Sequence, residues 1–183
     1  LITDVDLLSE KEYYHVHLQG SYVGDKQFIY DNQIVDQISG YYVLTPFVLK
    51  GDSRAILINR GFIPWNGRRD QIADIDIGAK IAEVKVQISK PVKRMELKAS
   101  EITQDFPVLV QALDVDEMSA IASLDFANIV GLLGPESENG FVRKWDPYTG
   151  SIERHIGYAI QWFLMALVLS IIGTLLALKQ QRK

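Results

Sequence analysis

A run of 23 residues without a charge, near the C-terminus, constrains this chain more than any other feature. It reads IGYAIQWFLMALVLSIIGTLLAL over residues 156–178. A helix needs about 20 apolar residues to cross the hydrocarbon core of a bilayer. A chain of 183 residues has little soluble core in which to bury such a segment. The run therefore predicts a transmembrane helix rather than a buried core helix.

The charges that follow this run predict its orientation. Lys179, Arg182 and Lys183 close the chain without an acidic residue. The positive-inside rule places such a tail in the cytoplasm, or in the matrix of a mitochondrion. The preceding bulk of the chain is then expected in the periplasm or the intermembrane space. The chain opens with Leu1 in mid-pattern, so we expect an upstream piece to be missing.

Composition excludes several classes of function. The net charge is −4, and without the three cations of the tail the remainder carries about −7, which argues against nucleic-acid binding. Cysteine is absent, so disulfides, thiolate metal sites and a cysteine nucleophile are excluded. No GxSxG, phosphate-loop or HExxH pattern occurs in the sequence. We predict that the protein is not an enzyme.

Strand-like patterns dominate the rest of the chain. Short segments rich in β-branched and aromatic residues recur about every ten residues, with glycines and Asn66-Gly67 as turn signals between them. This spacing is typical of an antiparallel sandwich or barrel. The predicted strands cover residues 13–19, 27–35, 41–49, 55–63, 83–89, 108–113 and 141–144.

Two further segments complete the predicted fold. Residues 115–123 predict a short helix capped by Asp114. Residues 126–133 are compatible with either a strand or a helix, and residues 70–80 and 135–140 predict loops. The fold class is mainly β with minor α (α+β). An antiparallel, barrel- or sandwich-like extramembrane domain (1–150) precedes the transmembrane helix and its basic tail (151–183).

One face at the start of the predicted helix carries a histidine and aromatic side chains. Tyr158, Ala159 and Trp162 follow His155 at positions i+3, i+4 and i+7, so the four share a face. An imidazole beside two aromatic rings is suited to ligating a haem iron. The alternative is an interfacial histidine that lies among lipid headgroups, with the aromatic rings in the interfacial belt.

Small residues form a stripe further along the same helix. Such residues allow a second helix to approach closely, although membrane helices are generally rich in them. The stripe predicts packing on another helix or simply reflects ordinary membrane-helix composition. Its members are Ala166, Ser170, Gly173, Thr174 and Ala177.

Two other polar groups have both a structural and a functional interpretation. His15 and His17 share one face of a predicted strand, as in a metal site or as two exposed histidines. Arg60 lies in NRGFIPW, where Gly61 and Pro64 end a strand in a tight bend. Arg60 then either pairs with an acidic neighbour or meets a propionate or a partner's carboxylate.

Two of these segments together resemble the Surfeit locus protein 1 family. ILINRGFIPW, residues 56–65, is similar to that family's "NRG-aromatic-x-P" strand. RHIGYAIQWF, residues 154–163, is similar to its "H-x-x-Y-A-x-x-W-[FY]" motif at the start of a membrane helix. One departure is Glu153-Arg154, where many members have Asn before the histidine. The resemblance spans nearly the whole chain.

The resemblance implies an assembly factor for haem-copper cytochrome c oxidase that binds haem a or presents it to the catalytic subunit. The implied partners are oxidase subunits, especially subunit 1, and other assembly or haem-synthesis proteins. The implied location is a bacterial inner membrane, with two helices flanking a periplasmic domain, or alternatively the mitochondrial inner membrane. By position, His155 matches the family's histidine associated with haem, with Tyr158 and Trp162 beside it as candidate haem-binding residues. The residues that match the helix-entry motif are Tyr158, Ala159, Trp162 and Phe163, and those that match the strand motif are Asn59, Arg60, Gly61, Phe62 and Pro64.

A second function is compatible with the same features. The protein is then a structural membrane chaperone that stabilises oxidase subunits by protein contacts, without haem. In that case the β-rich domain and the small-residue stripe bind an oxidase subunit, and His155 only packs against neighbouring side chains.

Overall fold

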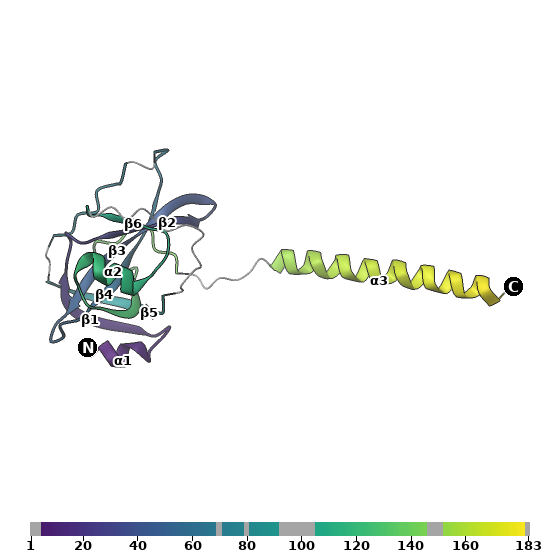
Figure 1. The fold of residues 1–183 in the computed structure, drawn as a ribbon, viewed down its shortest axis with the longest axis horizontal. Coiled ribbons are helices and arrows are strands. Elements are labelled where there is room, and N and C mark those ends of the chain that lie inside the picture. Colours follow the sequence, from purple (N-terminus) through teal and green to yellow (C-terminus); the bar gives the residue numbers. More distant parts are fainter. Residues whose placement is uncertain (1–4, 69–70, 79–80, 92–104, 146–151, 182–183) are drawn as a thin grey trace. The chain divides into compact units, whose positions relative to one another are not determined.

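The computed structural model describes residues 5–68, 71–78, 81–91, 105–145 and 152–181, with the side chains of 152–154 excepted. It divides into two units, residues 1–145 and 146–183 (Figure 1). The predicted boundary between residues 150 and 151, and the cations Arg182 and Lys183, lie outside the described residues.

The first unit is mainly β, as the sequence predicts. Its strands overlap the predicted segments, although β6 ends at Val110 rather than at residue 113. Buried positions alternate along β1 and most of β5, whereas the first eight residues of β4 are all buried. The elements are α1 (Val5–Ser9), β1 (His15–Tyr22), β2 (Phe28–Val35), β3 (Ile38–Leu49), β4 (Ala55–Pro64), β5 (Ile81–Ser89), β6 (Val108–Val110), α2 (Val115–Ala122) and β7 (Phe126–Leu133).

Among the described residues the strands form one seven-stranded sheet in the order β1-β5-β7-β4-β3-β2-β6. An additional pairing of β1 with β3, from Gly20↔Leu49 to Tyr22↔Phe47, folds the sheet over on itself. The domain is therefore sandwich-like. Most pairings are antiparallel, but β4–β7 and β2–β6 are parallel. Alternation of residues does not encode the direction in which a distant strand returns, so this difference was not visible in the sequence.

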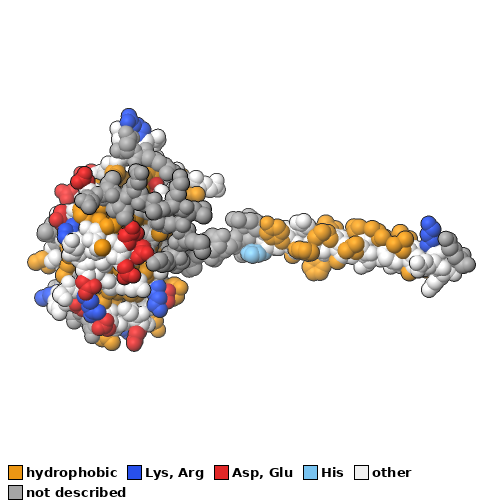
Figure 2. Space-filling view, in the orientation of Figure 1, with side chains coloured by type: hydrophobic (Ala, Val, Ile, Leu, Met, Phe, Trp, Pro, Cys, Tyr) orange, Lys and Arg blue, Asp and Glu red, His pale blue; other side chains and the backbone are white. Residues whose placement is uncertain are grey.

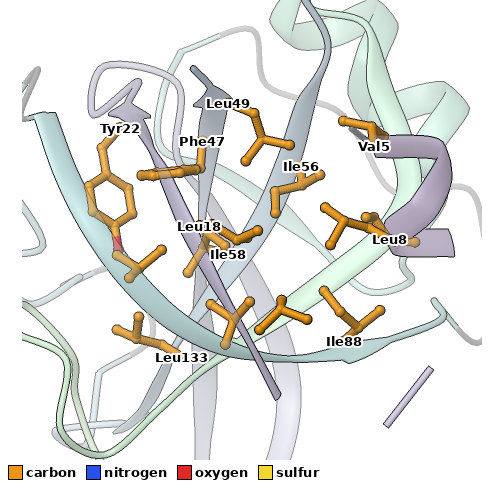
Figure 3. Close-up of a cluster of buried hydrophobic side chains, with 14 residues drawn as sticks. Val5, Leu8, Leu18, Tyr22, Phe47, Leu49, Ile56, Ile58, Ile88 and Leu133 are labelled. Atoms are coloured by element: carbon orange, nitrogen blue, oxygen red, sulfur yellow. The ribbon is translucent and has the colours of Figure 1, made fainter. Parts of the chain in front are cut away.

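Three clusters of buried hydrophobic side chains lie in the described part of the unit, and the smallest is formed by Ile29, Tyr41, Val43 and Ile75. In the first, Tyr22 meets Phe47 edge-on with ring centroids 4.9 Å apart, and aliphatic side chains of several strands surround them (Figure 3). The second lies beneath α2, which buries Val115 and Met118 against the sheet. The predicted cap of α2 is confirmed, because the Asp114 carboxylate accepts the Glu117 N–H at 3.3 Å.

Three local predictions change. Residues 126–133 form a strand, β7, because they lie between β4 and β5. Residues 141–144 form only an isolated bridge, Phe62↔Val142, rather than a strand. Helix α1 was not predicted, since its five residues carry too little periodicity to indicate a helix.

The second unit contains one helix, α3 (Ile152–Gln181). Its 30 residues span about 45 Å at 1.5 Å per residue, more than the roughly 30 Å of a hydrocarbon core. Every side chain described on it is exposed, and Figure 2 shows hydrophobic side chains along its length. The helix is long and apolar enough to cross a membrane.

Candidate functional site

The NRGFIPW motif forms a β-bulge in β4. Leu44 pairs with Asn59 and Tyr42 with Phe62, so Arg60 and Gly61 together oppose a single residue of β3. The Asn59 side-chain oxygen accepts the Gly61 N–H at 3.0 Å, which fixes the bulge locally.

Gly61 is required at the bulge for two reasons. Its φ of +121° lies in a region that side chains with a Cβ rarely adopt. A Cβ at this position would also lie 2.8 Å from the carbonyl oxygen of Val142. The glycine therefore permits both the bend and the close approach of the segment after β7.

The bulge turns the Arg60 side chain into the protein, where it is only 2% exposed. Its Nε donates to the Asn139 carbonyl at 2.8 Å, and its Nη1 donates to the Gln27 side-chain oxygen at 2.9 Å. Nη1 also donates to the Ile75 carbonyl at 2.8 Å. One guanidinium thus joins the residue just before β2, the loop at residue 75 and the loop at residue 139.

No carboxylate pairs with Arg60 within the described part of the chain. The ring of Phe141 lies 5.0 Å from its guanidinium carbon and adds a cation–π contact. Burial lowers the pKa of the guanidinium. Of the two alternatives for Arg60, pairing with an acidic neighbour is not found among the described residues. Contact with an external carboxylate would require the surrounding loops to move.

Two buried residues that hold Arg60 were missed by the sequence reasoning. Thr45 donates from its hydroxyl to the Gln27 side-chain oxygen at 2.7 Å, and both residues are buried. Their only signal is a polar side chain within or beside an apolar strand. That pattern does not reveal a partner 15 or 33 residues away.

The rest of the motif ties β4 to its neighbours. Phe62 is buried and donates its N–H to the Val142 carbonyl at 2.7 Å. Pro64 pairs with Gly40 at the end of the strand. The strand motif of this chain therefore acts as a scaffold at the centre of the domain.

The candidate haem face lies on α3. Because α3 is a continuous helix from residue 152, His155, Tyr158, Ala159 and Trp162 share one face as predicted. All four are exposed, Trp162 by 69%. Phe163, the next motif residue, is exposed as well. The strand motif belongs to the other unit.

The side chains on this face of α3 are chemically suited to bind one side of a haem group. Imidazole is a common axial ligand of haem iron, and aromatic rings pack well against a flat macrocycle. The methyl side chain of Ala159 adds little bulk between His155 and Trp162. The face therefore offers one axial ligand and an aromatic surface beside it.

The small-residue stripe does not depend on a partner for its hydrogen bonds. Ser170 donates to the Ala166 carbonyl and Thr174 to the Ser170 carbonyl, each at 2.8 Å. With both hydroxyls satisfied inside the helix, the stripe is compatible with lipid or with another helix.

The paired histidines of β1 are both exposed on one side of the strand. His17 Nδ1 lies 3.6 Å from the Glu83 carboxylate. Among the described residues no group of three acidic, histidine or cysteine side chains is arranged to hold a metal ion. A cleft of about 540 Å³ beside His17 is lined by Tyr22, Glu83 and Lys85, but not by the predicted haem residues. Burial raises the pKa of the Tyr22 phenol to about 12.

Comparison with known proteins covers most of the chain. A sequence model of the SURF1 family matches residues 2–167. The matched range contains both the β4 motif and the candidate haem face of α3. No curated protein matches the chain significantly.

Proposed function

Because the chain belongs to the SURF1 family of cytochrome oxidase assembly factors, we propose that it binds haem a through His155 and presents it to the oxidase. The family is one of assembly factors and not of catalysts, so its partners are oxidase-related. The family and the apolar helix α3 together indicate a membrane protein. The proposed recipient of the haem is oxidase subunit 1, with haem-synthesis proteins as further partners.

The observation that carries this proposal is the exposed face at the start of α3. His155 supplies an imidazole, and Tyr158 and Trp162 supply aromatic surfaces on the same side of the helix. An imidazole beside aromatic surfaces at the beginning of a membrane span is suited to an apolar, flat ligand.

The proposed location is a bacterial inner membrane, with the β domain in the periplasm and further helices in the full-length protein. Lys179, after the apolar run, then lies on the cytoplasmic side. This arrangement places His155 at the periplasmic surface of the bilayer. The mitochondrial inner membrane is the equivalent alternative, with the β domain in the intermembrane space.

An optical spectrum of the full-length protein tests the proposal. The protein and its His155→Ala variant are purified from a host that makes haem a. We expect a haem a Soret band in the native protein and at least a tenfold loss of that band in the variant. His17→Ala is the matched control, because His17 is an exposed histidine remote in sequence from α3.

A second variant tests how the haem packs. Ala159→Leu keeps the imidazole but adds bulk between His155 and Trp162, and we expect it to lose most of the bound haem. A Soret band that is absent from the native protein, or unchanged in His155→Ala, would refute the haem proposal.

The haem-free chaperone is the second candidate function, and the small-residue stripe favours it. The double variant Ser170→Leu with Gly173→Leu places two bulky side chains in the stripe. Nothing lies within 4 Å of a Cβ built at Gly173, so the helix itself accommodates the change. A chaperone that uses this stripe loses co-purification of the oxidase in the double variant. Leu169→Ala, at an exposed position outside the stripe, is the control. Unchanged co-purification would count against this candidate.

A further inference from the structure

The hairpin between β2 and β3 ends in a tip, residues 33–39, that exposes two isoleucines. Val35 pairs with Ile38 across a two-residue turn in which Asp36 and Gln37 have φ of +51° and +67°. Ile34 is 73% exposed and Ile38 is 54% exposed. Large apolar side chains at the end of a narrow hairpin require an explanation.

The tip has no face that packs on the core. Ile38 lies opposite Val35, and side chains alternate along a strand, so Ile34 and Ile38 point to opposite faces. An irregularity in the ladder between Tyr30 and Gln33 separates the tip from the buried part of β2. Both faces of the tip therefore project beyond the core with an isoleucine on each.

The base of the hairpin is fixed by the end of the β4 motif. Trp65 donates from its indole to the Asp31 carboxylate at 3.0 Å, and from its backbone N–H to the Ser39 carbonyl at 3.1 Å. At the turn, Lys144 forms an ion pair with Asp36. The tip is thus tied to the last residues of the first unit.

The last described residues of the first unit lie beside this tip. Trp145 follows Lys144 and is anchored by its indole, which donates to the Leu133 carbonyl at 2.8 Å. Seven residue steps separate Trp145 from the start of α3 at Ile152. They span at most about 25 Å when fully extended. The connection from the first unit to the helix that is suited to cross a bilayer is therefore short.

We propose that the tip inserts Ile34 and Ile38 into the interfacial region of that bilayer, as a second and shallower membrane contact. The inference rests on the membrane association of the chain and is independent of haem binding. The Asp36–Lys144 pair leaves little net charge at the turn, which lowers the cost of bringing it against lipid.

Lipid suits this tip better than a protein partner. Two isoleucines on opposite faces offer no continuous surface, whereas a stable protein interface buries about 800 Å² on each partner. A lipid interface surrounds both faces at once, so each side chain leaves water without needing a shaped groove.

Depth-dependent fluorescence quenching tests the inference in the full chain. The sequence contains no cysteine, so a single introduced cysteine accepts one environment-sensitive probe. The variants are Ile34→Cys and the control Ile81→Cys, since Ile81 is 79% exposed on a strand that pairs with neither β2 nor β3. Both are reconstituted in phosphatidylcholine vesicles that contain nitroxide-labelled headgroups. We expect at least twofold quenching at position 34 and little at position 81.

A second set of variants removes the proposed contact. With the probe at Gln37→Cys, the added changes Ile34→Asp and Ile38→Asp are expected to abolish quenching. Both side chains are exposed, so the fold is retained. Equal quenching at positions 34 and 81 would overturn the inference. Quenching or protection at position 34 that arises only when oxidase is added would assign the tip to a protein partner and would also overturn it. The haem spectrum is expected to be unaffected in these variants, so the two proposals fail separately.

Discussion

The β4 motif and the start of α3 are two short motifs of one family, yet they have opposite environments. Arg60 is 2% exposed and its donors are bonded inside the domain, whereas Trp162 is 69% exposed. The first motif holds four segments of its own unit together. The second presents an imidazole and aromatic rings outward. A family motif can therefore mark a scaffold or a contact surface, and burial distinguishes the two.

The same contrast holds for hydrogen bonding. A buried charge is tolerated only when its donors are satisfied, and Arg60 obtains its acceptors from residues distant in sequence. In α3 the hydroxyls of Ser170 and Thr174 are satisfied locally, by carbonyls of the preceding turn. Substitutions in the first motif should therefore affect folding, and those in the second should affect ligands or partners.

The largest expected effect is that of Arg60→Ala. Removing the guanidinium empties a buried site and takes a charged donor from the Gln27 side chain and from the Ile75 and Asn139 carbonyls. We expect a loss of about 3–4 kcal/mol in the free energy of unfolding. Urea unfolding of the full chain in detergent, followed by tryptophan fluorescence, measures it. Arg54→Ala, which removes a partly exposed ion pair, is the control. Equally small losses of unfolding free energy in the two variants would contradict the contrast between the two motifs.

The next effect comes from Gly61. Gly61→Ala combines an unfavourable φ with a Cβ 2.8 Å from the Val142 carbonyl, so we expect a loss of about 2–3 kcal/mol. Gly67→Ala is the matched control, since Gly67 also has a positive φ but nothing lies within 4 Å of its Cβ position. Its expected loss is about 1 kcal/mol. Equal losses in the same urea assay would show that the close approach of residue 142 is unimportant.

A smaller effect depends on pH. Hydrogen bonds from Arg54 lower the pKa of the Asp52 carboxyl from 3.8 to about 2. A carboxyl with a lowered pKa in the folded state stabilises the protein above its unfolded pKa, and this contribution disappears as the pH falls through the folded pKa. At pH 6 the native protein should therefore unfold at a higher urea concentration than Arg54→Ala. The difference between the two urea midpoints should become smaller as the pH falls below 4. A gap that widens at pH 3 would contradict this assignment.

The smallest expected effect on stability is that of His155→Ala. The side chain is exposed on α3, so the unfolding free energy of the β domain should change by less than about 0.5 kcal/mol. The same urea assay measures this. The comparison is sharpest if His155→Ala loses haem but keeps its unfolding free energy, while Arg60→Ala loses unfolding free energy but keeps its haem. A large loss of stability in His155→Ala would show that this histidine is structural.

Much of the fold was predictable because its signals are local. The alternation in residues 83–89 and the cap at Asp114 depend only on neighbouring residues, and the structure confirms both. The candidate haem face was predictable for the same reason, since a helix of known period fixes which residues share a side. The neutral acceptors of Arg60 were not predictable, because they are brought together only by tertiary packing.

The sequence by itself determined that this chain has a β-rich domain, an apolar helix long enough to span a bilayer, and a histidine with aromatic residues on one helical face. These follow from composition and from periods of two and 3.6 residues. Only the tertiary structure decided that Arg60 is buried among neutral acceptors, that β7 runs parallel to β4, and that the hairpin tip pairs with Lys144. Each of these joins residues far apart in the chain, and no local pattern encodes such pairs.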